Sequence, residues 1–247
     1  MKTPARKTLR RLVHSVLPFT HERPSNTKGS PTIVGSFPPR ELYARVGTPE
    51  NYFIHDGYRP RTEAIYFDDT ASEDQWQLEV YQFAKEIADL RHLTTVCDIG
   101  CGSAHKLLRY FRALETIGVD VPKTCEYLRT KYPDRLWVDW NCEIVPPMRV
   151  DLVIAADVIE HLVNPDELLK YIQKLQPKYA VISTPDRNLF RYACHNGPPT
   201  NPAHIREWSF AEFDAYLSRF FEVEEHFISF PAQATQCALC RPREVTL

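Results

Sequence analysis

The chain has 247 residues, of which 43% are hydrophobic and 25% are charged, and its formal net charge is −2. These are ordinary values for a globular protein, and they exclude an overall basic field that would recruit nucleic acid by charge alone. No apolar run approaches the roughly 18–20 residues of a membrane span, and the length suits one α/β domain with an extension.

Cysteine usage predicts reduced thiols and a cytoplasmic protein. The seven cysteines are odd in number and scattered, and the apolar residues near the start of the chain are too few for a secretory signal peptide. Cys237-Ala-Leu-Cys240 is a single C-x-x-C without a second ligand pair for zinc. We interpret it as part of a strand, with a redox role as the minor alternative.

The first 92 residues are expected to form two regions. Residues 1–30 include Lys2, Arg6, Lys7, Arg10 and Arg11, followed by a Pro/Ser/Thr/Gly stretch, which indicates a flexible basic segment; a short amphipathic helix on an acidic surface or membrane is the alternative. Residues 31–92 are interpreted as an N-terminal cap or lid. Ser72-x-x-Gln75 has the form of a capping box, and it predicts a helix whose apolar positions begin at Trp76.

From residue 94 strands and helices alternate, and residues 93–247 are predicted to form the main domain. Strands are expected at 94–99, 116–121, 135–139, 150–156, 179–184, 223–230 and 235–241, and helices at 103–114, 122–132, 165–175 and 209–220. The pattern predicts an α/β fold: a doubly wound seven-stranded sheet whose last strands form a hairpin-like edge, with helices on both faces.

The turn after the first of these strands carries the strongest functional signal. Glycine has no Cβ and tolerates φ > 0, so Gly100 and Gly102 would let a ligand lie against the backbone. The third glycine of the G-x-G-x-x-G pyrophosphate pattern is replaced by His105, and Asp98 would repel a pyrophosphate. The turn therefore favours a positively charged ligand without phosphate, such as S-adenosylmethionine (SAM).

Acidic residues stand where further predicted strands end. Asp120 closes the second strand and Asp139-Trp140 the third, while Asp157-Val-Ile-Glu160-His161 follows the fourth. In open α/β sheets ligands bind outside the carboxyl ends of the strands. Taken singly, Asp98 could cap a helix, Asp120 could cap the helix beginning at Pro122, and Asp139 could be a loop acid. The ordered set favours a cofactor site.

Three segments together resemble the successive motifs of class I SAM-dependent methyltransferases. They are Val96–Gly102, Ile117–Asp120 and Asp151–Leu162. The resemblance implies a seven-stranded sheet, mostly parallel with an antiparallel final strand, and SAM as cofactor. It implies the following contacts: Asp98, Gly100 and Gly102 with the methionine part, Asp120 with the ribose, Asp139 and Trp140 with adenine, and Ala155 and Ala156 with the ammonium, with Asp157 also among the cofactor-binding residues. Gln77 stands where an N-terminal lid would close over the cofactor.

The acceptor side is less defined. Glu160-His161, followed by His204-x-x-Glu207-Trp208, is similar to small-RNA terminal 2′-O-methyltransferases and to ubiquinone-pathway O-methyltransferases. Asp157, Glu160, His161 and His204 are the candidate catalytic residues. In the RNA enzymes such a set binds a divalent ion, so Glu160, His161 and His204 are an alternative metal site, but the metal-free version is favoured because Asp157 replaces a longer glutamate.

We expect a methyl transfer from SAM to a small molecule, at a hydroxyl oxygen. RNA 2′-O-methylation with a metal-assisted site is the first alternative, although the acidic balance makes nucleic acid an unlikely partner, and a non-catalytic SAM-binding regulatory subunit is the second. Five cap residues could form an acceptor pocket or a plain aromatic core: Tyr52, His55, Tyr58, Arg61 and Tyr66. The sequence predicts neither the acceptor nor the oligomeric state.

Overall fold

The structure is a computed structural model that describes residues 46–63, 65–141, 143, 145–191 and 195–243. The chain divides into two units, residues 1–37 and 38–247, and every described residue belongs to the second. The predicted basic segment 1–30 therefore lies outside the described residues, as does the beginning of the predicted cap.

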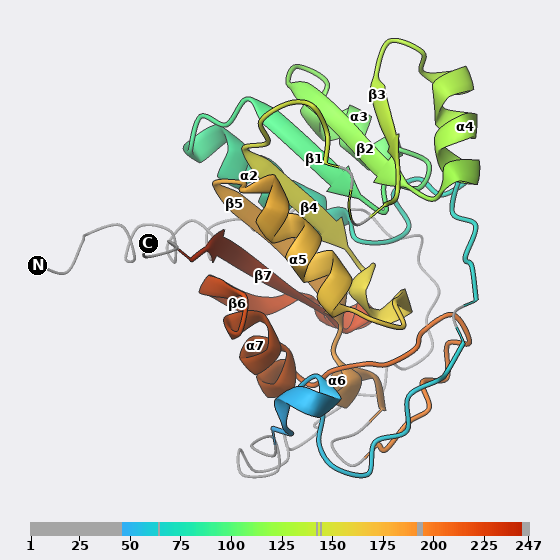
Figure 1. The fold of residues 1–247 in the computed structure, drawn as a ribbon, viewed down its shortest axis with the longest axis vertical. Helices are drawn as coiled ribbons and strands as arrows, with labels where there is room; N and C mark the ends of the chain where they lie inside the picture. Colours follow the sequence, from blue (N-terminus) through green and yellow to red (C-terminus); the bar gives the residue numbers. More distant parts are fainter. Residues whose placement is uncertain (1–45, 64, 142, 144, 192–194, 244–247) are drawn as a thin grey trace, which may run out of the picture. The chain divides into compact units, whose positions relative to one another are not determined.

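A seven-stranded sheet forms the centre of the described part of the chain (Figure 1). Its strands are β1 (Thr95–Ile99), β2 (Glu115–Asp120), β3 (Leu136–Asp139), β4 (Leu152–Ala156), β5 (Tyr179–Pro185), β6 (Phe221–Phe230) and β7 (Thr235–Pro242). The spatial order is β3-β2-β1-β4-β5-β7-β6; the first five strands are parallel, and β7 runs antiparallel to both β5 and β6. The predicted fold class is confirmed.

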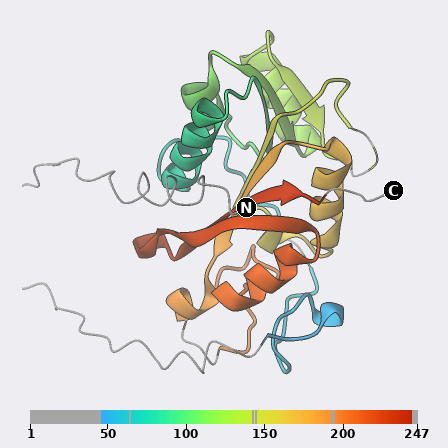
Figure 2. The same ribbon diagram turned by 90° about the vertical axis from the view of Figure 1, so that its left-hand side faces the viewer.

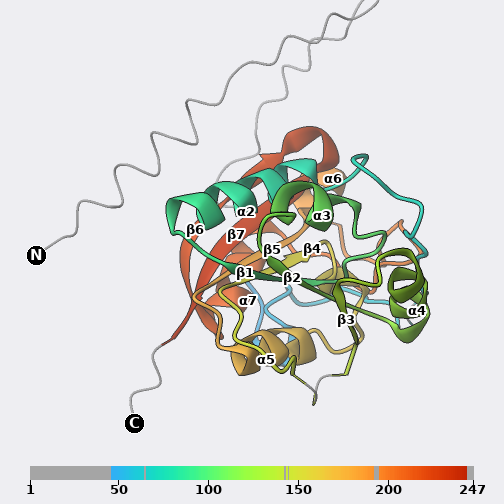
Figure 3. The ribbon, with the colours of Figure 1, turned by 90° about the horizontal axis from the view of Figure 1, so that it is seen from above.

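Helices cover both faces of this sheet. They are α2 (Leu78–Leu90), α3 (His105–Phe111), α4 (Pro122–Lys131), α5 (Asp166–Leu175), α6 (Arg187–Arg191) and α7 (Phe210–Ser218), with the short 3₁₀ turns η2 (Pro49–Asn51), η3 (Ile159–His161) and η4 (Pro231–Gln233). Figure 3 shows α2 and α3 on one face and α5 and α7 on the other. None of the described helices has the length and apolar character that crossing a membrane requires.

Central strands are apolar because both of their faces are covered. Every residue of β4, Leu-Val-Ile-Ala-Ala, is buried between β1 and β5, as expected for a parallel strand with helices on both sides. The predicted capping box at Ser209 is present: Ser209 Oγ accepts from the Glu212 amide, and Glu212 Oε2 accepts from the Ser209 amide at 2.8 Å. These bonds satisfy amides at the start of α7 that have no partner within the helix.

The second predicted capping box, at Ser72, is wrong. The α2 helix begins only at Leu78, after Gln77 in the left-handed conformation (φ +56°), and the Gln75 side chain accepts from the Glu73 amide instead of closing a box. Residues 65–77 are an extended and turned segment, called the strap below. The Ser72 carbonyl accepts from Ser103 Oγ, so the strap is bonded to the glycine turn rather than wound into a helix.

The segment 46–63 packs on the C-terminal half of the domain. Figures 1 and 2 show η2 beside α7. Trp208 Nε1 donates to the Tyr52 carbonyl at 2.9 Å, Tyr58 Oη accepts from the Glu207 amide at 2.9 Å, and the Arg61 amide donates to the Ile205 carbonyl. These bonds hold the loop 195–208, and through it they position one wall of the site.

Candidate active site

A cavity of about 640 Å³ opens at the carboxyl ends of β1, β2, β4 and β5. The strand order reverses between β1 and β4, and such a switch point is where α/β folds bind ligands. The strap forms one wall with Ile65, Phe67, Asp69 and Gln77, and Asn201 and His204 lie on another side.

The glycine turn has the predicted conformation. Gly100 has φ +71° and Gly102 has φ +51°, values that favour glycine. Gly100 also needs the missing side chain, since a Cβ there would lie 2.5 Å from Val158 Cγ2. The Asp69 carboxylate of the strap lies against Gly102, and burial followed by the charge of Asp120 raises the pKa of Asp69 to about 6. The turn thus brings backbone and carboxylates together at one end of the cavity.

Asp98 lies behind this turn and is fully buried. One carboxylate oxygen accepts a hydrogen bond from Tyr81 Oη at 2.9 Å, and the other has no hydrogen-bond partner in the part of the chain that the structure describes. Burial raises its pKa to about 7. Asp98 is not the cap of α3, because Ala104 occupies that position. A buried carboxylate oxygen without a hydrogen-bond partner lowers the stability of the fold, so its presence indicates that the charge of Asp98 has a function.

Asp120 both hydrogen-bonds the glycine turn and lines the cavity. Its two oxygens accept from the amides of Gly102 at 2.8 Å and Val121 at 2.7 Å. The side chain also lines the cavity, and burial raises its pKa. The helix-capping alternative is not realised, since Val121 is the N-cap of α4 and no side-chain cap bond is present there; Asp120 stays the predicted ribose ligand.

Of the neighbouring residues Asp139 and Trp140, one lines the cavity and the other does not. Trp140 lines the cavity and packs edge-on against Tyr171 with ring centroids 5.0 Å apart. Asp139 does not line the cavity; its carboxylate accepts from Arg129 Nη2 at 2.7 Å and is half exposed. The predicted contact of Asp139 with adenine finds no support in this geometry, because the arginine draws the side chain toward α4.

The end of β4 leads into a strained residue. Ala155 is fully buried and Ala156 lines the cavity, while Asp157 has φ +54°, which is rare for a residue with a side chain. Ser183 Oγ donates to Asp157 Oδ1 at 2.6 Å, and Gln77 also hydrogen-bonds this carboxylate. Burial raises the pKa of Asp157. Such strain is typical of functional sites.

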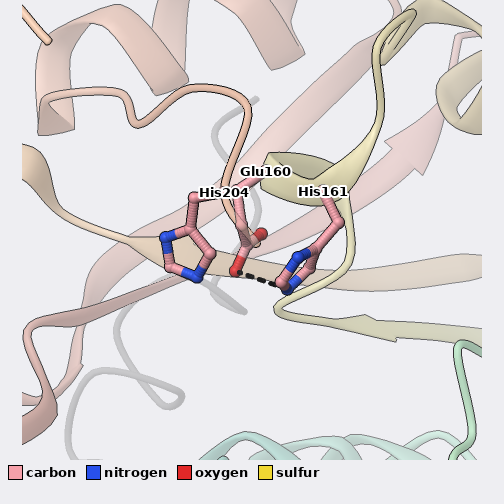
Figure 4. A group of neighbouring side chains, drawn as sticks. All are labelled: Glu160, His161 and His204. Carbon is pink, nitrogen blue, oxygen red and sulfur yellow. Dashed lines mark ion pairs between the residues drawn. The ribbon is translucent and has the colours of Figure 1, made fainter. Parts of the chain in front are cut away.

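Glu160, His161 and His204 form a cluster at the other end of the cavity (Figure 4). One ligand-capable atom from each lies within 4.8 Å of the others. His161 Nε2 is 4.0 Å from Glu160 Oε1, which is buried and has no hydrogen-bond partner. Burial, followed by the charge of Asp157, raises the pKa of Glu160 to about 8. Three of the four predicted catalytic residues therefore meet as one group, with Asp157 nearby.

Hydrogen bonds hold both imidazole rings of the cluster in place. His161 Nδ1 is 2.9 Å from the Ala203 carbonyl, which only accepts, so Nδ1 carries the proton. His204 Nδ1 is 2.8 Å from Glu207 Oε1, and its Nε2 is 2.9 Å from Nδ2 of the Asn201 side chain. Burial lowers the pKa of His161 and favours its neutral form. His161 therefore keeps an unprotonated Nε2 on the side of Glu160, whereas His204 Nε2 is within hydrogen-bond distance of the Asn201 side chain.

Three charged residues of the segment 185–208 make hydrogen bonds or ion pairs within the fold. Arg187 pairs with Glu212 at 2.7 Å, and both side chains are buried. Asp186 accepts from two amides in the first turn of α6, and Arg206 donates to two carbonyls that follow η3. Of the five cap residues considered for an acceptor pocket only Tyr66 lines the cavity; Tyr52, His55, Tyr58 and Arg61 do not.

Three residues of the site were not singled out from the sequence. They are Asp69, Tyr81 and Lys106. Asp69 stands in a region without periodicity, and Tyr81 and Lys106 stand within helical patterns where a packing role is expected. Lys106 had one detectable signal, a lysine on the buried side of a helix directly after a ligand-binding turn.

The sheet, its glycine turn and the acids at the ends of β1 and β2 define a class I SAM-dependent methyltransferase. The chain belongs to the methyltransferase domain family, whose model matches residues 67–238. The match includes the strap and all the strands except the last residues of β7.

Curated proteins with similar sequences agree with this assignment. Small RNA 2′-O-methyltransferases of Rattus norvegicus and Mus musculus are each 25% identical over 179 residues, which cover 63% of this chain and 45% of theirs. The chain thus spans less than half the length of these curated relatives.

Solved structures share the fold at lower identity. The Burkholderia thailandensis 1,6-didemethyltoxoflavin-N1-methyltransferase, with bound 1,6-didemethyltoxoflavin and S-adenosylhomocysteine, has a TM-score of 0.53 at 17% identity, covering 75% of this chain and 94% of its own. The methyltransferase domain of bacterial CtHen1-C has a TM-score of 0.52 at 18% identity, covering 66% and 97%.

Proposed function

We propose that this chain transfers the methyl group of SAM to a hydroxyl oxygen of a small, uncharged acceptor. The observation that carries the proposal is the cluster of Glu160, His161 and His204 at the end of the cavity away from the glycine turn. SAM supplies the methyl group on a good leaving group, so the protein has to align the acceptor and accept its proton.

His161 is the best base for that proton. Its Nε2 is unprotonated, because the Ala203 carbonyl holds the proton on Nδ1, and its neutral form is favoured by burial. Glu160 Oε1 lies 4.0 Å from Nε2 and stabilises the ring once it is charged. His204 packs edge-on against His161 with ring centroids 4.9 Å apart. The ring of His204 is held by Glu207, as a positioned base or ligand would be.

The same three groups fit a divalent cation. Imidazole nitrogens of His161 and His204 and the Oε1 atom of Glu160, which has no hydrogen-bond partner among the described residues, form a set that zinc, iron and related ions accept once the Asn201 side chain releases His204 Nε2. Each ring is oriented through its Nδ1, as is usual for metal ligands. Glu160, His161 and His204 would hold the ion. A bound ion would lower the pKa of the acceptor hydroxyl. Asp157 is engaged by Ser183 and Gln77 and is not part of the set.

The charge of the cavity favours an uncharged acceptor. Four carboxylates line it, from Asp69, Asp120, Asp157 and Glu160, against a single lysine. A phosphodiester would meet this negative field. The apolar side chains of the strap that border the cavity are at least half exposed, Ile65 by 54%, Phe67 by 58% and Trp76 by 53%. They offer an apolar surface for the body of the acceptor.

Methyl transfer from radiolabelled SAM to a panel of phenols, catechols and sugars tests the proposal. An O-methyl ether is stable in alkali, whereas a methyl ester is not. His161→Gln should lower kcat by about 10²-fold or more while leaving the dissociation constant of SAM unchanged, and His92→Gln, in the exposed turn after α2, is the matched control. Label appearing only on nitrogen or carbon, or a His161→Gln variant as active as the control, would contradict hydroxyl chemistry.

Chelation tests the cation separately. Loss of activity in EDTA, with recovery on adding Mn²⁺ or Co²⁺, supports the metal-assisted version. Activity that EDTA leaves untouched supports the histidine base alone.

A second acceptor class is favoured by one observation, the similarity to the small RNA 2′-O-methyltransferases. A 3′-terminal ribose also offers a hydroxyl to the same cluster. Labelling of an RNA oligonucleotide, abolished by prior oxidation of its terminal diol, together with RNA binding that weakens steeply with salt, would favour RNA over a small molecule.

A further inference from the structure

Lys106 is the one lysine or arginine among the described residues that line the cavity. It stands in the first turn of α3, directly after the glycine turn, and it is 9% exposed. Its Nζ donates to the Glu73 carbonyl of the strap at 2.9 Å and lies 5.3 Å from the centroid of the Tyr81 ring. An ammonium has three donors, so two are left for a ligand.

The surroundings of Lys106 are acidic. Burial lowers its pKa, and the charges of Asp98, Asp69 and Asp157 oppose that shift, which places three carboxylates around the ammonium. Asp98 Oδ1 has no hydrogen-bond partner although it is fully buried. The end of the cavity nearest the glycine turn therefore holds one ammonium among several carboxylates. Among the described residues, the Lys106 ammonium makes one hydrogen bond and Asp98 Oδ1 makes none, so both can still bind groups of a ligand.

The methionine part of SAM has the matching pattern of charges. It carries an ammonium and a carboxylate on one carbon atom and a sulfonium further along. The carboxylates at this end suit the two positive groups, but they would repel the carboxylate of SAM unless a cation receives it. Backbone amides of the turn are partly used, since the Gly102 amide already donates to Asp120.

We propose that Lys106 binds the carboxylate of the methionine part of SAM and so makes the site selective for SAM over analogues that lack this group. The inference rests on SAM as the methyl donor in the proposed function and is independent of the acceptor. Lys106 also ties the strap to α3 through Glu73, so a purely structural role has to be distinguished by the choice of ligand.

Lys106→Met keeps the length and apolar stem of the side chain and removes its charge. Dissociation constants are measured by titration calorimetry, without acceptor, for SAM, for decarboxylated SAM and for 5′-methylthioadenosine, which lacks the whole amino-acid end. The control is Lys123→Met, because Lys123 also contacts the strap, at Asp68, but its side chain is 76% exposed and does not line the cavity.

The wild type and Lys123→Met should bind SAM roughly 10- to 100-fold more tightly than decarboxylated SAM, the range of a charge-assisted hydrogen bond. In Lys106→Met this ratio should fall to within about threefold of unity, with 5′-methylthioadenosine bound as in the wild type. Lys106→Arg, which restores a cation, should recover most of the preference.

Two results would overturn the inference while leaving SAM binding intact: an unchanged ratio in Lys106→Met, or equal weakening of all three ligands, which is the signature of a structural role. If Lys106→Met is unfolded by circular dichroism, the same ratio measured on Lys106→Gln decides between these outcomes. A wild-type protein that bound none of the ligands would overturn the methyl-donor assignment and this inference with it.

Discussion

Replacing Asp98 by asparagine should make the ligand-free protein more stable and SAM binding weaker. Asp98 is fully buried, one of its oxygens is unpartnered, and the Tyr81 hydroxyl is its sole hydrogen-bond donor among the described residues. Asparagine has nearly the same shape and no charge, and its oxygen can keep the bond from Tyr81. The substitution therefore isolates the cost of the buried charge.

The size of this cost follows from the pKa. Burial raises the pKa of Asp98 from 3.8 to about 7. Between those values the folded state binds a proton that the unfolded state has lost, so Asp98 destabilises the fold increasingly as pH rises, and the full cost is present above pH 7. Each pKa unit corresponds to 1.36 kcal/mol, which gives about 4 kcal/mol at pH 8 and about 1.5 kcal/mol at pH 5.

Urea unfolding of the wild type and Asp98→Asn at pH 8 and pH 5 measures this difference. The stabilisation of the variant should be about 2–3 kcal/mol larger at pH 8 than at pH 5. Asp89→Asn is the control, because Asp89 is exposed and paired with Lys85 on the surface of α2, and its effect should stay below about 1 kcal/mol at both values. A gain that is equal at both pH values, or a loss of stability at pH 8, refutes the assignment of a destabilising buried charge.

The same variant tests why the charge is retained. If Asp98 faces the positive groups of SAM, Asp98→Asn should bind SAM at least about tenfold more weakly, the effect of losing one charge-assisted hydrogen bond. Wild-type affinity for SAM should fall as pH drops from 8 to 6, because the carboxyl must lose its proton to bind a cation, and this pH dependence should be reduced in the variant. Stability given up for function is common at active sites.

Three further outcomes are expected. Gly102→Ala should abolish SAM binding at saturating wild-type concentrations, measured by calorimetry, because φ is +51° and an added Cβ would meet the Asp69 carboxylate; binding within tenfold of wild type would refute this. Arg187→Met should destabilise the protein by about 3–5 kcal/mol in urea unfolding, since it leaves Glu212 buried without its ion pair; a loss below about 1 kcal/mol would contradict the pairing. Asp139→Ala should change the dissociation constant of SAM by less than about twofold, since the side chain forms an ion pair on the surface; a tenfold loss would restore Asp139 as an adenine ligand.

The donor side of the site was predictable because it is local in sequence. Gly100 and Gly102 lie in one turn, and Asp120 follows from the next strand, whose parallel pairing with β1 brings Gly118 opposite Asp98. Hydrophobic runs and turn residues sufficed for a doubly wound sheet of seven strands, and the resemblance supplied its antiparallel final strand. The cluster of Glu160, His161 and His204 was also anticipated, although His204 lies more than 40 residues beyond the other two, because the resemblance supplied the pairing.

The rest depends on contacts that a single sequence does not encode locally. Asp139 was expected at the adenine, but Arg129 competes for it from α4. Ser72 and Gln75 have the spacing of a capping box, yet bonds to Ser103 and from Glu73 hold them in the strap instead. At Ser72 a tertiary hydrogen bond overrode a local propensity, whereas Asp139 was placed at the adenine by the resemblance, and that placement stays a prediction.

Asp157 connects the two ends of the cavity. Its backbone follows Ala156, beside the donor site, its carboxylate is hydrogen-bonded by Gln77 of the strap, and its charge raises the pKa of Glu160 in the acceptor cluster. A positive charge near Asp157 would favour the ionised forms of both carboxyls, and ionised Glu160 strengthens His161 as a base. Once the sulfonium has become a neutral thioether, that stabilisation is lost and both carboxyls bind protons more readily. On the proposed function, the charge of a cofactor bound beside Asp157 would therefore tune the proton affinity of Glu160, and with it the strength of His161 as a base.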